Sequence, residues 1–161
     1  MGFGAKIISL AALKKLRPRL GKIVITGGGF DPIHPGHISS LIESKQYGDT
    51  LVVIVNGDAF LSAKKGRPFQ NLQTRCLIVS AIRKVDYVVP FEIKNDQTIT
   101  KAIEEIKPHV FTKGGDRRNK STIPEWGICQ KYGVEIITGV GVDKQWSSSQ
   151  FLKEWEESSG V

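Results

Sequence analysis

Short apolar runs alternate along this chain with longer segments whose apolar residues recur every three or four positions. The runs are rich in valine and isoleucine, as at residues 51–55, and continuous β-branched runs are typical of strands covered on both faces of a sheet. The longer segments, such as residues 71–82, have the periodicity of helices with one buried face. The pattern predicts strands at 22–26, 51–55, 85–90, 109–112 and 134–137, and helices at 36–46, 71–82, 97–106, 123–132 and 150–157.

Strands that alternate with helices indicate a parallel sheet whose connections are right-handed crossovers. We therefore expect an α/β fold with a Rossmann-like, doubly wound sheet of five strands and helices on both faces. Residues 7–20 carry leucines at helical spacing, with Ser9 as a candidate N-cap and Pro18 as a helix end or bend. We expect a packing helix within residues 1–21, a core at 22–161, and a single domain over 1–161.

The segment between the first core strand and the first core helix is rich in glycine and histidine. It reads Thr-Gly-Gly-Gly-Phe-Asp-Pro-Ile-His-Pro-Gly-His at residues 26–37. Glycines let the backbone approach a ligand closely, and the N–H groups and dipole of a helix N-terminus attract anions. A glycine turn or a lone histidine is usually structural, but the combination indicates a cradle for a triphosphate with catalytic donors. We assign His34 and His37 as catalytic donors, and as nucleotide contacts Gly27, Gly28, Gly29, Phe30, Asp31 and Gly36.

Two further turns follow strands of the predicted sheet. Loops at the carboxyl ends of parallel strands carry ligands in open α/β sheets, so Asn56 is expected near the histidines, unless it only caps a turn. Lys113, Gly114 and Asp116 follow the fourth strand, where the lysine can neutralise phosphate and the glycines admit a base or sugar. The alternative is a plain turn.

Basic residues between the second strand and the following helix form another candidate site. Lys64, Lys65 and Arg67 lie in a stretch that we interpret as a mobile loop closing over phosphates, or as solvated surface. Arg75 lies beside the apolar stripe of the next helix, near its start. It can present a planar fork to phosphate oxygens, or pair with a carboxylate on the surface.

Net charge adds information about partners. The chain of 161 residues has a formal charge of +7, which favours anionic partners. Its basic residues are spread out and no RNA-recognition or helix-turn-helix motif is evident, so a nucleotide with a sugar phosphate is favoured over nucleic acid. No apolar run reaches membrane-spanning length, and lysines interrupt the N-terminal apolar stretches, so we expect neither a membrane span nor a signal peptide. Cys76 and Cys129 lack zinc spacing and are interpreted as reduced core residues of a cytoplasmic protein.

The pattern Gly-x-Phe-Asp-Pro-x-His-x-Gly-His resembles the signature of the cytidylyltransferase-like nucleotidyltransferase superfamily, and the resemblance extends over residues 6–155. It implies an enzyme that joins a nucleoside triphosphate to a phosphorylated acceptor and releases pyrophosphate. Residues 48–58, 66–68, 85–91 and 113–116 are most similar to the adenylyltransferase domains that make ADP-heptose from a heptose 1-phosphate. Transfer of AMP to a sugar 1-phosphate is therefore favoured. The alternatives are a cytidylyltransferase acting on glycerol 3-phosphate or a similar alcohol phosphate, and a non-catalytic nucleotide- or nucleic-acid-binding module.

The same resemblance implies roles for individual residues. The two histidines would contact the triphosphate and stabilise the transition state, and mobile positive charge would come from the basic loop, with Lys65 as a catalytic residue. Arg75 would help to hold the phosphates. Mg²⁺ would travel with the triphosphate because no acidic cage is visible. Two copies of such a fold often pair, which allows a homodimer, although the sequence itself does not decide the oligomeric state. The last helix would begin with hydroxyls that hold the β- and γ-phosphates, namely catalytic Ser148 with Ser147 and Ser149.

Overall fold

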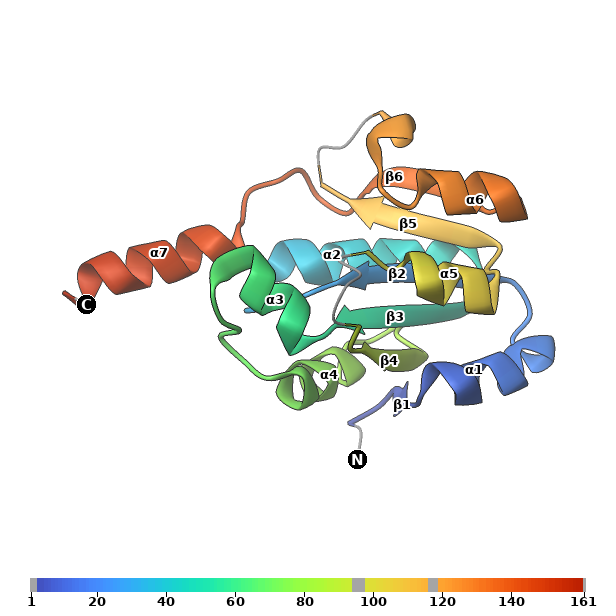
Figure 1. Ribbon diagram of the computed structural model, residues 1–161, viewed down its shortest axis with the longest axis horizontal. Coiled ribbons are helices and arrows are strands. Elements are labelled where there is room, and N and C mark those ends of the chain that lie inside the picture. Colours follow the sequence, from blue (N-terminus) through green and yellow to red (C-terminus); the bar gives the residue numbers. More distant parts are fainter. Residues whose placement is uncertain (1–2, 94–97, 116–118, 161) are drawn as a thin grey trace.

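The computed structural model describes residues 3–93, 98–115 and 119–160. Within these residues six strands form one sheet in the order β1-β4-β3-β2-β5-β6, and every pair is parallel (Figure 1). The strands are β1 (Lys6–Ile7), β2 (Ile23–Gly28), β3 (Thr50–Asn56), β4 (Tyr87–Phe91), β5 (Val110–Gly114) and β6 (Glu135–Val140). The helices are α1 (Leu10–Leu16), α2 (Pro35–Ser44), α3 (Asp58–Lys65), α4 (Leu72–Ser80), α5 (Thr100–Ile106), α6 (Trp126–Tyr132) and α7 (Ser148–Ser158), with 3₁₀ turns at Arg17–Arg19, Lys45–Tyr47 and Lys120–Thr122.

The predicted α/β class and the Rossmann-like sheet are confirmed. Every residue of β3 is buried, as its continuous apolar run indicated. The sheet has one strand more than expected, because β1 pairs with β4 at the edge through Lys6 and Ile7. A two-residue strand has no periodicity of its own, and only its neighbour in the sheet defines it.

Helices cover both faces of the sheet, and alternate strand residues supply the two cores. On one face Ile25 of β2 and Ile54 of β3 pack with residues of α1, α5 and α6. On the other face Val24 and Val53 pack with residues of α2 and α4, among them Leu41. The two cysteines are buried, one on each face. Burial raises the pKa of Cys76 to about 11 and that of Cys129 to about 12, so both thiols stay protonated at neutral pH.

Several predicted boundaries need correction, among them the start of the helix expected over 123–132, which begins at Trp126. Lys64 and Lys65 belong to the last turn of α3, an unpredicted helix in which only Leu61 is buried, so the basic stretch does not begin as a loop. The helix expected from residue 97 begins at Thr100, and residue 97 itself lies outside the described residues. The last helix begins at Ser148, because the side chain of Ser147 caps it.

The carboxyl ends of the strands lie on the same side of the molecule as α3 and α7 (Figure 1). From this edge α7 projects away from the body of the fold, and none of its residues is buried. In the part of the chain that the structure describes, no helix combines the length and apolar character needed to cross a bilayer.

Candidate active site

A cavity of about 640 Å³ opens at the carboxyl edge of the sheet, a size that is ordinary for small-molecule sites. The glycine-rich turn after β2, the start of α2, the end of β5 and residues 142–146 line it. The chain crosses from β2 to β3 on one side and later reaches β5 on the other, so β2 marks the switch point of the topology. Open α/β sheets bind their ligands at such points.

The side chains of His34 and His37 cap the start of α2, because each ring accepts a hydrogen bond from the backbone N–H of the other residue. Nδ1 of His34 accepts a hydrogen bond from the N–H of His37, and Nδ1 of His37 accepts one from the N–H of His34, both at 3.3 Å. The rings stack with centroids 3.7 Å apart. Because both Nδ1 atoms act as acceptors, a neutral ring must carry its proton on Nε2. Each histidine therefore keeps an N–H donor for a ligand in the cavity that both rings line.

The surroundings keep these rings uncharged at neutral pH. Burial lowers the pKa of His37 from 6.5 to about 4, with smaller contributions from the charges of His34 and Lys64. Burial also lowers the pKa of His34. The pair thus offers neutral donors in the free protein, and the negative charge of a bound polyphosphate would raise both pKa values.

Two glycines of this turn lie close to neighbouring side chains. A Cβ on Gly36 would lie 3.0 Å from Cε1 of His34, so a side chain there would disturb the stacked rings. A Cβ on Gly29 would lie 2.8 Å from Cδ2 of Leu61. Phe30 lies edge-on to His37, with ring centroids 5.2 Å apart. The cavity lining includes Gly27, Gly28, Gly29, Phe30 and Gly36, whose contact with a nucleotide stays a prediction.

Asp31 differs from its predicted role as a nucleotide contact. Its side chain is fully buried and accepts hydrogen bonds from the backbone N–H groups of Phe69 and Gln70, both at 2.7 Å. It also pairs with Nζ of Lys65 at 2.9 Å. Lys65 is therefore held by a buried carboxylate rather than mobile, and neither residue is among those that line the cavity.

Arg75 is also placed differently from the expectation. It is fully buried, and its guanidinium donates to the carbonyls of Gly29 and Asn56 and to Oδ1 of Asp58, at 3.0, 2.5 and 2.7 Å. A further bond at 2.9 Å reaches the carbonyl of Gln70. The structure agrees with the alternative interpretation, in which Arg75 pairs with a carboxylate. The guanidinium, however, makes this ion pair with Asp58 in the interior and not on the surface. Arg75 fastens the ends of β2 and β3 together and does not present its fork to the cavity.

The remaining basic and hydroxyl candidates divide between two places. Lys64 lines the main cavity, whereas Arg67 and Ser149 line a separate groove of about 340 Å³ beside α7. Ser147 caps the N–H of Gln150, and Oγ of Ser148 donates to the carbonyl of Pro32 at 2.6 Å. The start of α7 is thus tied to the histidine turn, but none of the three serines lines the main cavity.

Expected residues on the other strands meet the same cavity. Asn56, at the end of β3, is almost fully buried and lines it, together with Lys113 and Gly114 from β5. Asp116 lies outside the described residues. Within residues 3–93, 98–115 and 119–160 no group of three or more His, Cys, Asp and Glu side chains is arranged to hold a metal ion.

Comparison with known proteins decides the family. The profile described as cytidylyltransferase-like matches residues 25–150, a span that contains the histidine turn and every residue described above as lining the cavity. The chain belongs to this cytidylyltransferase-like family. The family resemblance predicted from the histidine signature is confirmed.

Relatives of known name cover most of this chain. Bifunctional protein HldE from Hahella chejuensis is 39% identical over 127 residues, which are 78% of this chain and 26% of that protein. The protein of the same name from Cronobacter sakazakii is 42% identical over 121 residues, 71% of this chain and 24% of that protein. The chain spans about a quarter of the length of these curated relatives.

Solved structures support the fold. The lipopolysaccharide core biosynthesis protein from Thermoplasma volcanium superposes with a TM-score of 0.63 at 28% identity, over 76% of this chain and 99% of that one. Pantoate-beta-alanine ligase from Francisella tularensis gives a TM-score of 0.66 at 16% identity, over 92% of this chain and 73% of that one. The second likeness concerns the fold alone.

Several residues at this cytidylyltransferase-like site were not predicted from the sequence. Glu125 precedes α6 and is buried in the cavity wall, while Thr98 and Ile99 reach the wall from the start of α5. Trp146, which directly precedes the three serines, also lines the cavity. None of these residues belongs to a local motif, and only the packing of α5 and α6 with each other and with the sheet in one core brings Glu125 and Ile99 to the site.

Proposed function

We propose that this chain is an adenylyltransferase that transfers AMP from ATP to the phosphate of a sugar 1-phosphate and releases pyrophosphate. The observation that carries the proposal is the reciprocally capped pair His34 and His37, whose Nε2 donors remain available beside the N-terminus of α2. Membership of the cytidylyltransferase-like family and the similarity to ADP-heptose-forming domains noted from the sequence support it.

The proposed reaction is a single displacement at phosphorus. An oxygen of the acceptor phosphate attacks the α-phosphorus of ATP, a new P–O bond forms, and the bond to the bridging β-phosphate oxygen breaks. Charge that builds up on the phosphoryl oxygens is stabilised by the two Nε2–H groups, the positive end of the α2 dipole, and the positive charge of Lys64. Little covalent chemistry is required of the protein.

Magnesium would enter the site bound to the triphosphate. The groups around the phosphate end of the cavity are mainly nitrogen donors, whereas Mg²⁺ prefers oxygen ligands and retains several waters. Phosphate oxygens and water would hold the ion, and it would neutralise negative charge on ATP. The side chains described here then act on the phosphates rather than on the ion.

The test is a screen for pyrophosphate release. ATP, CTP, GTP and UTP are each combined with sugar 1-phosphates, including heptose 1-phosphate, and with glycerol 3-phosphate. We expect release with ATP and a sugar 1-phosphate. Release with CTP and glycerol 3-phosphate instead would favour the cytidylyltransferase alternative, and binding of nucleotide without any release would favour a non-catalytic module.

Substitutions of the two histidines test whether this pair stabilises the transition state. His34→Ala and His37→Ala should each lower kcat by roughly 100- to 1000-fold, the usual cost of removing one transition-state donor. His109→Asn is the matched control, because His109 is remote from the cavity lining and its Nδ1 accepts from the N–H of Ile23, which asparagine can replace. Unchanged turnover in His37→Ala would contradict the assignment.

A further inference from the structure

The far end of the cavity contains a buried carboxylate that the proposed phosphate chemistry does not use. Glu125 is 3% exposed and lines the cavity just before α6. Its Oε2 has no hydrogen-bond partner in the part of the chain that is described, and the side chain does not cap α6. A buried acceptor without a donor is costly, and nearly all such groups in proteins are satisfied. A ligand that donates a hydrogen bond would satisfy it.

Lys113 gives this carboxylate a charged neighbour. Its Nζ lies 3.5 Å from Oε2 of Glu125 and 5.8 Å from the ring centroid of Phe111. Lys113 is partly exposed, so its ammonium retains donors for a ligand. An acceptor and a donor therefore stand side by side in the cavity wall, next to the apolar surfaces of Phe111 and Ile99.

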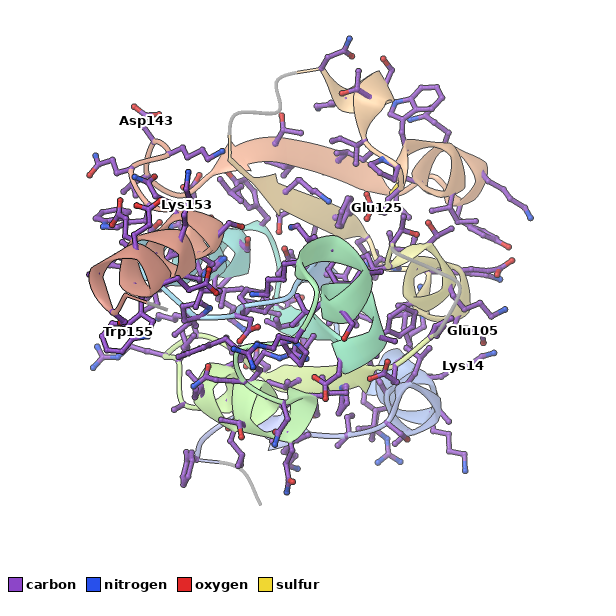
Figure 2. The ribbon with its side chains drawn as sticks, turned by 60° about the vertical axis from the view of Figure 1, so that its left-hand side comes forward. Lys14, Glu105, Glu125, Asp143, Lys153 and Trp155 are labelled. Atoms are coloured by element: carbon purple, nitrogen blue, oxygen red, sulfur yellow. The ribbon has the colours of Figure 1, made fainter. Side chains whose placement is uncertain are left out.

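This pair lies at the opposite end of the cavity from the histidines. Phe111 and Ile99 belong to the core on the face of α1, α5 and α6, whereas α2 and its histidines lie on the other face. The two ends meet over Gly27, where a Cβ would lie 2.7 Å from Cγ2 of Ile99. Figure 2 shows Glu125 at the start of α6, well separated from Asp143 and from Trp155 on α7.

The chemistry of the pair favours hydroxyl groups over phosphate or base. A carboxylate repels phosphate, so the triphosphate belongs at the histidine end. Residues 142–146 and the ring of Trp146 are on the wall near the histidines, where a base can pack. A sugar hydroxyl can donate to a carboxylate and accept from an ammonium at the same time, and a sugar ring also has apolar C–H surface for the neighbouring side chains.

We propose that Glu125 and Lys113 bind the hydroxyl groups of the acceptor's polyhydroxylated part, and that Glu125 selects hydroxylated acceptors. This inference rests on the proposed transfer to a sugar 1-phosphate and adds the residues that recognise the sugar. An acceptor without the contacted hydroxyl leaves Oε2 of Glu125 without a hydrogen bond in the interior, with only the ion pair to Lys113 at 3.5 Å. Sites built to hydrogen-bond a substrate hydroxyl reject analogues that lack it.

The test compares the wild type with Glu125→Gln, which keeps the size of the side chain and removes its charge. With ATP saturating, pyrophosphate release is measured against the concentration of the active sugar 1-phosphate and of its mono-deoxy analogues. We expect KM for the sugar phosphate to rise roughly 10- to 100-fold, the cost of a hydrogen bond to a charged group. KM for ATP should stay within about twofold of the wild-type value.

The deoxy analogues separate recognition from a structural effect. For the analogue that lacks the contacted hydroxyl, wild type and Glu125→Gln should have similar kcat/KM, because the interaction is already absent. Glu135→Gln is the matched control, since Glu135 is an exposed carboxylate on β6 outside the cavity lining. A change in KM for ATP alone would overturn the inference, as would equal KM values for the sugar phosphate in both proteins.

Direct binding keeps this inference separate from the proposed reaction. Calorimetry measures binding of the sugar 1-phosphate to both proteins in the presence of a non-hydrolysable ATP analogue. If the wild type releases no pyrophosphate, the proposed function fails, yet binding that weakens roughly 10- to 100-fold in Glu125→Gln would still support the sugar site. Absence of binding to the wild type, or equal binding to both, would overturn the inference.

Discussion

Lowering the pH from about 7.5 to about 5 should destabilise the free protein, and His37 should account for a calculable share of that loss. Its pKa is about 4 in the folded protein, below the ordinary 6.5 that applies to the unfolded chain. Between these values the unfolded chain binds more protons than the folded protein. Stability from this residue is therefore complete above pH 6.5 and is lost as the pH falls toward 4.

The magnitude follows from the size of the shift. One pKa unit corresponds to about 1.4 kcal/mol, so the full shift at His37 corresponds to about 3 kcal/mol. Lowering the pH to about 5 covers roughly 1.5 units of the range between the two pKa values. The free energy of unfolding should therefore fall by about 2 kcal/mol. That is a large fraction of the 5 to 15 kcal/mol by which domains are roughly stabilised.

His37→Asn isolates this contribution. The asparagine side chain offers an oxygen to the backbone N–H of His34, which the ring of His37 now caps, and it does not titrate. Urea unfolding of both proteins at the two pH values gives four free energies of unfolding. The wild type should lose about 2 kcal/mol more than the variant on acidification. Equal losses in the two proteins would refute the burial of His37 in its neutral form.

Two further predictions concern ligand binding and the buried ion network. Binding of a non-hydrolysable ATP analogue at about pH 5.5 should be accompanied by proton uptake, because phosphate raises the pKa of His37. Calorimetry in buffers of different ionisation enthalpy should show a smaller uptake in His37→Asn than in the wild type. Identical uptake in the two proteins would place the phosphates elsewhere. Arg75→Met should lower the free energy of unfolding by about 3 to 5 kcal/mol in urea titrations, because the buried acceptors around Arg75 lose their donor. A loss below about 1 kcal/mol would mean that these hydrogen bonds contribute little to stability.

The fold was predictable because its signals are local. The apolar run of β3 and the helical spacing of α4 each indicate which of their own residues are buried. The alternation of such segments along the chain implies a parallel sheet. β1 was not predicted, because its two residues form a strand only through their pairing with β4. The predicted single domain, pairing of two copies and cytoplasmic location stay predictions.

The site was predictable only where its chemistry is contiguous. His34 and His37 lie three residues apart, so one turn of α2 fixes their geometry. Arg75 was misplaced because its four partners come from three separate segments, which no helical pattern reveals. Glu125 was missed for the same reason, since its partner Lys113 belongs to another element.

The cavity extends from the α2 face to the α5 and α6 face of the sheet, and this continuity has a kinetic consequence. Both reactants have room to be seated together, so the proposed transfer can occur directly between them without a nucleotidyl-enzyme stage. Such a route is a sequential rather than a ping-pong mechanism, and one displacement inverts the configuration at the reacting phosphorus. At the crossing, a Cβ on Gly27 would lie 2.7 Å from Cγ2 of Ile99, so a side chain there would displace the cavity wall between the two ends.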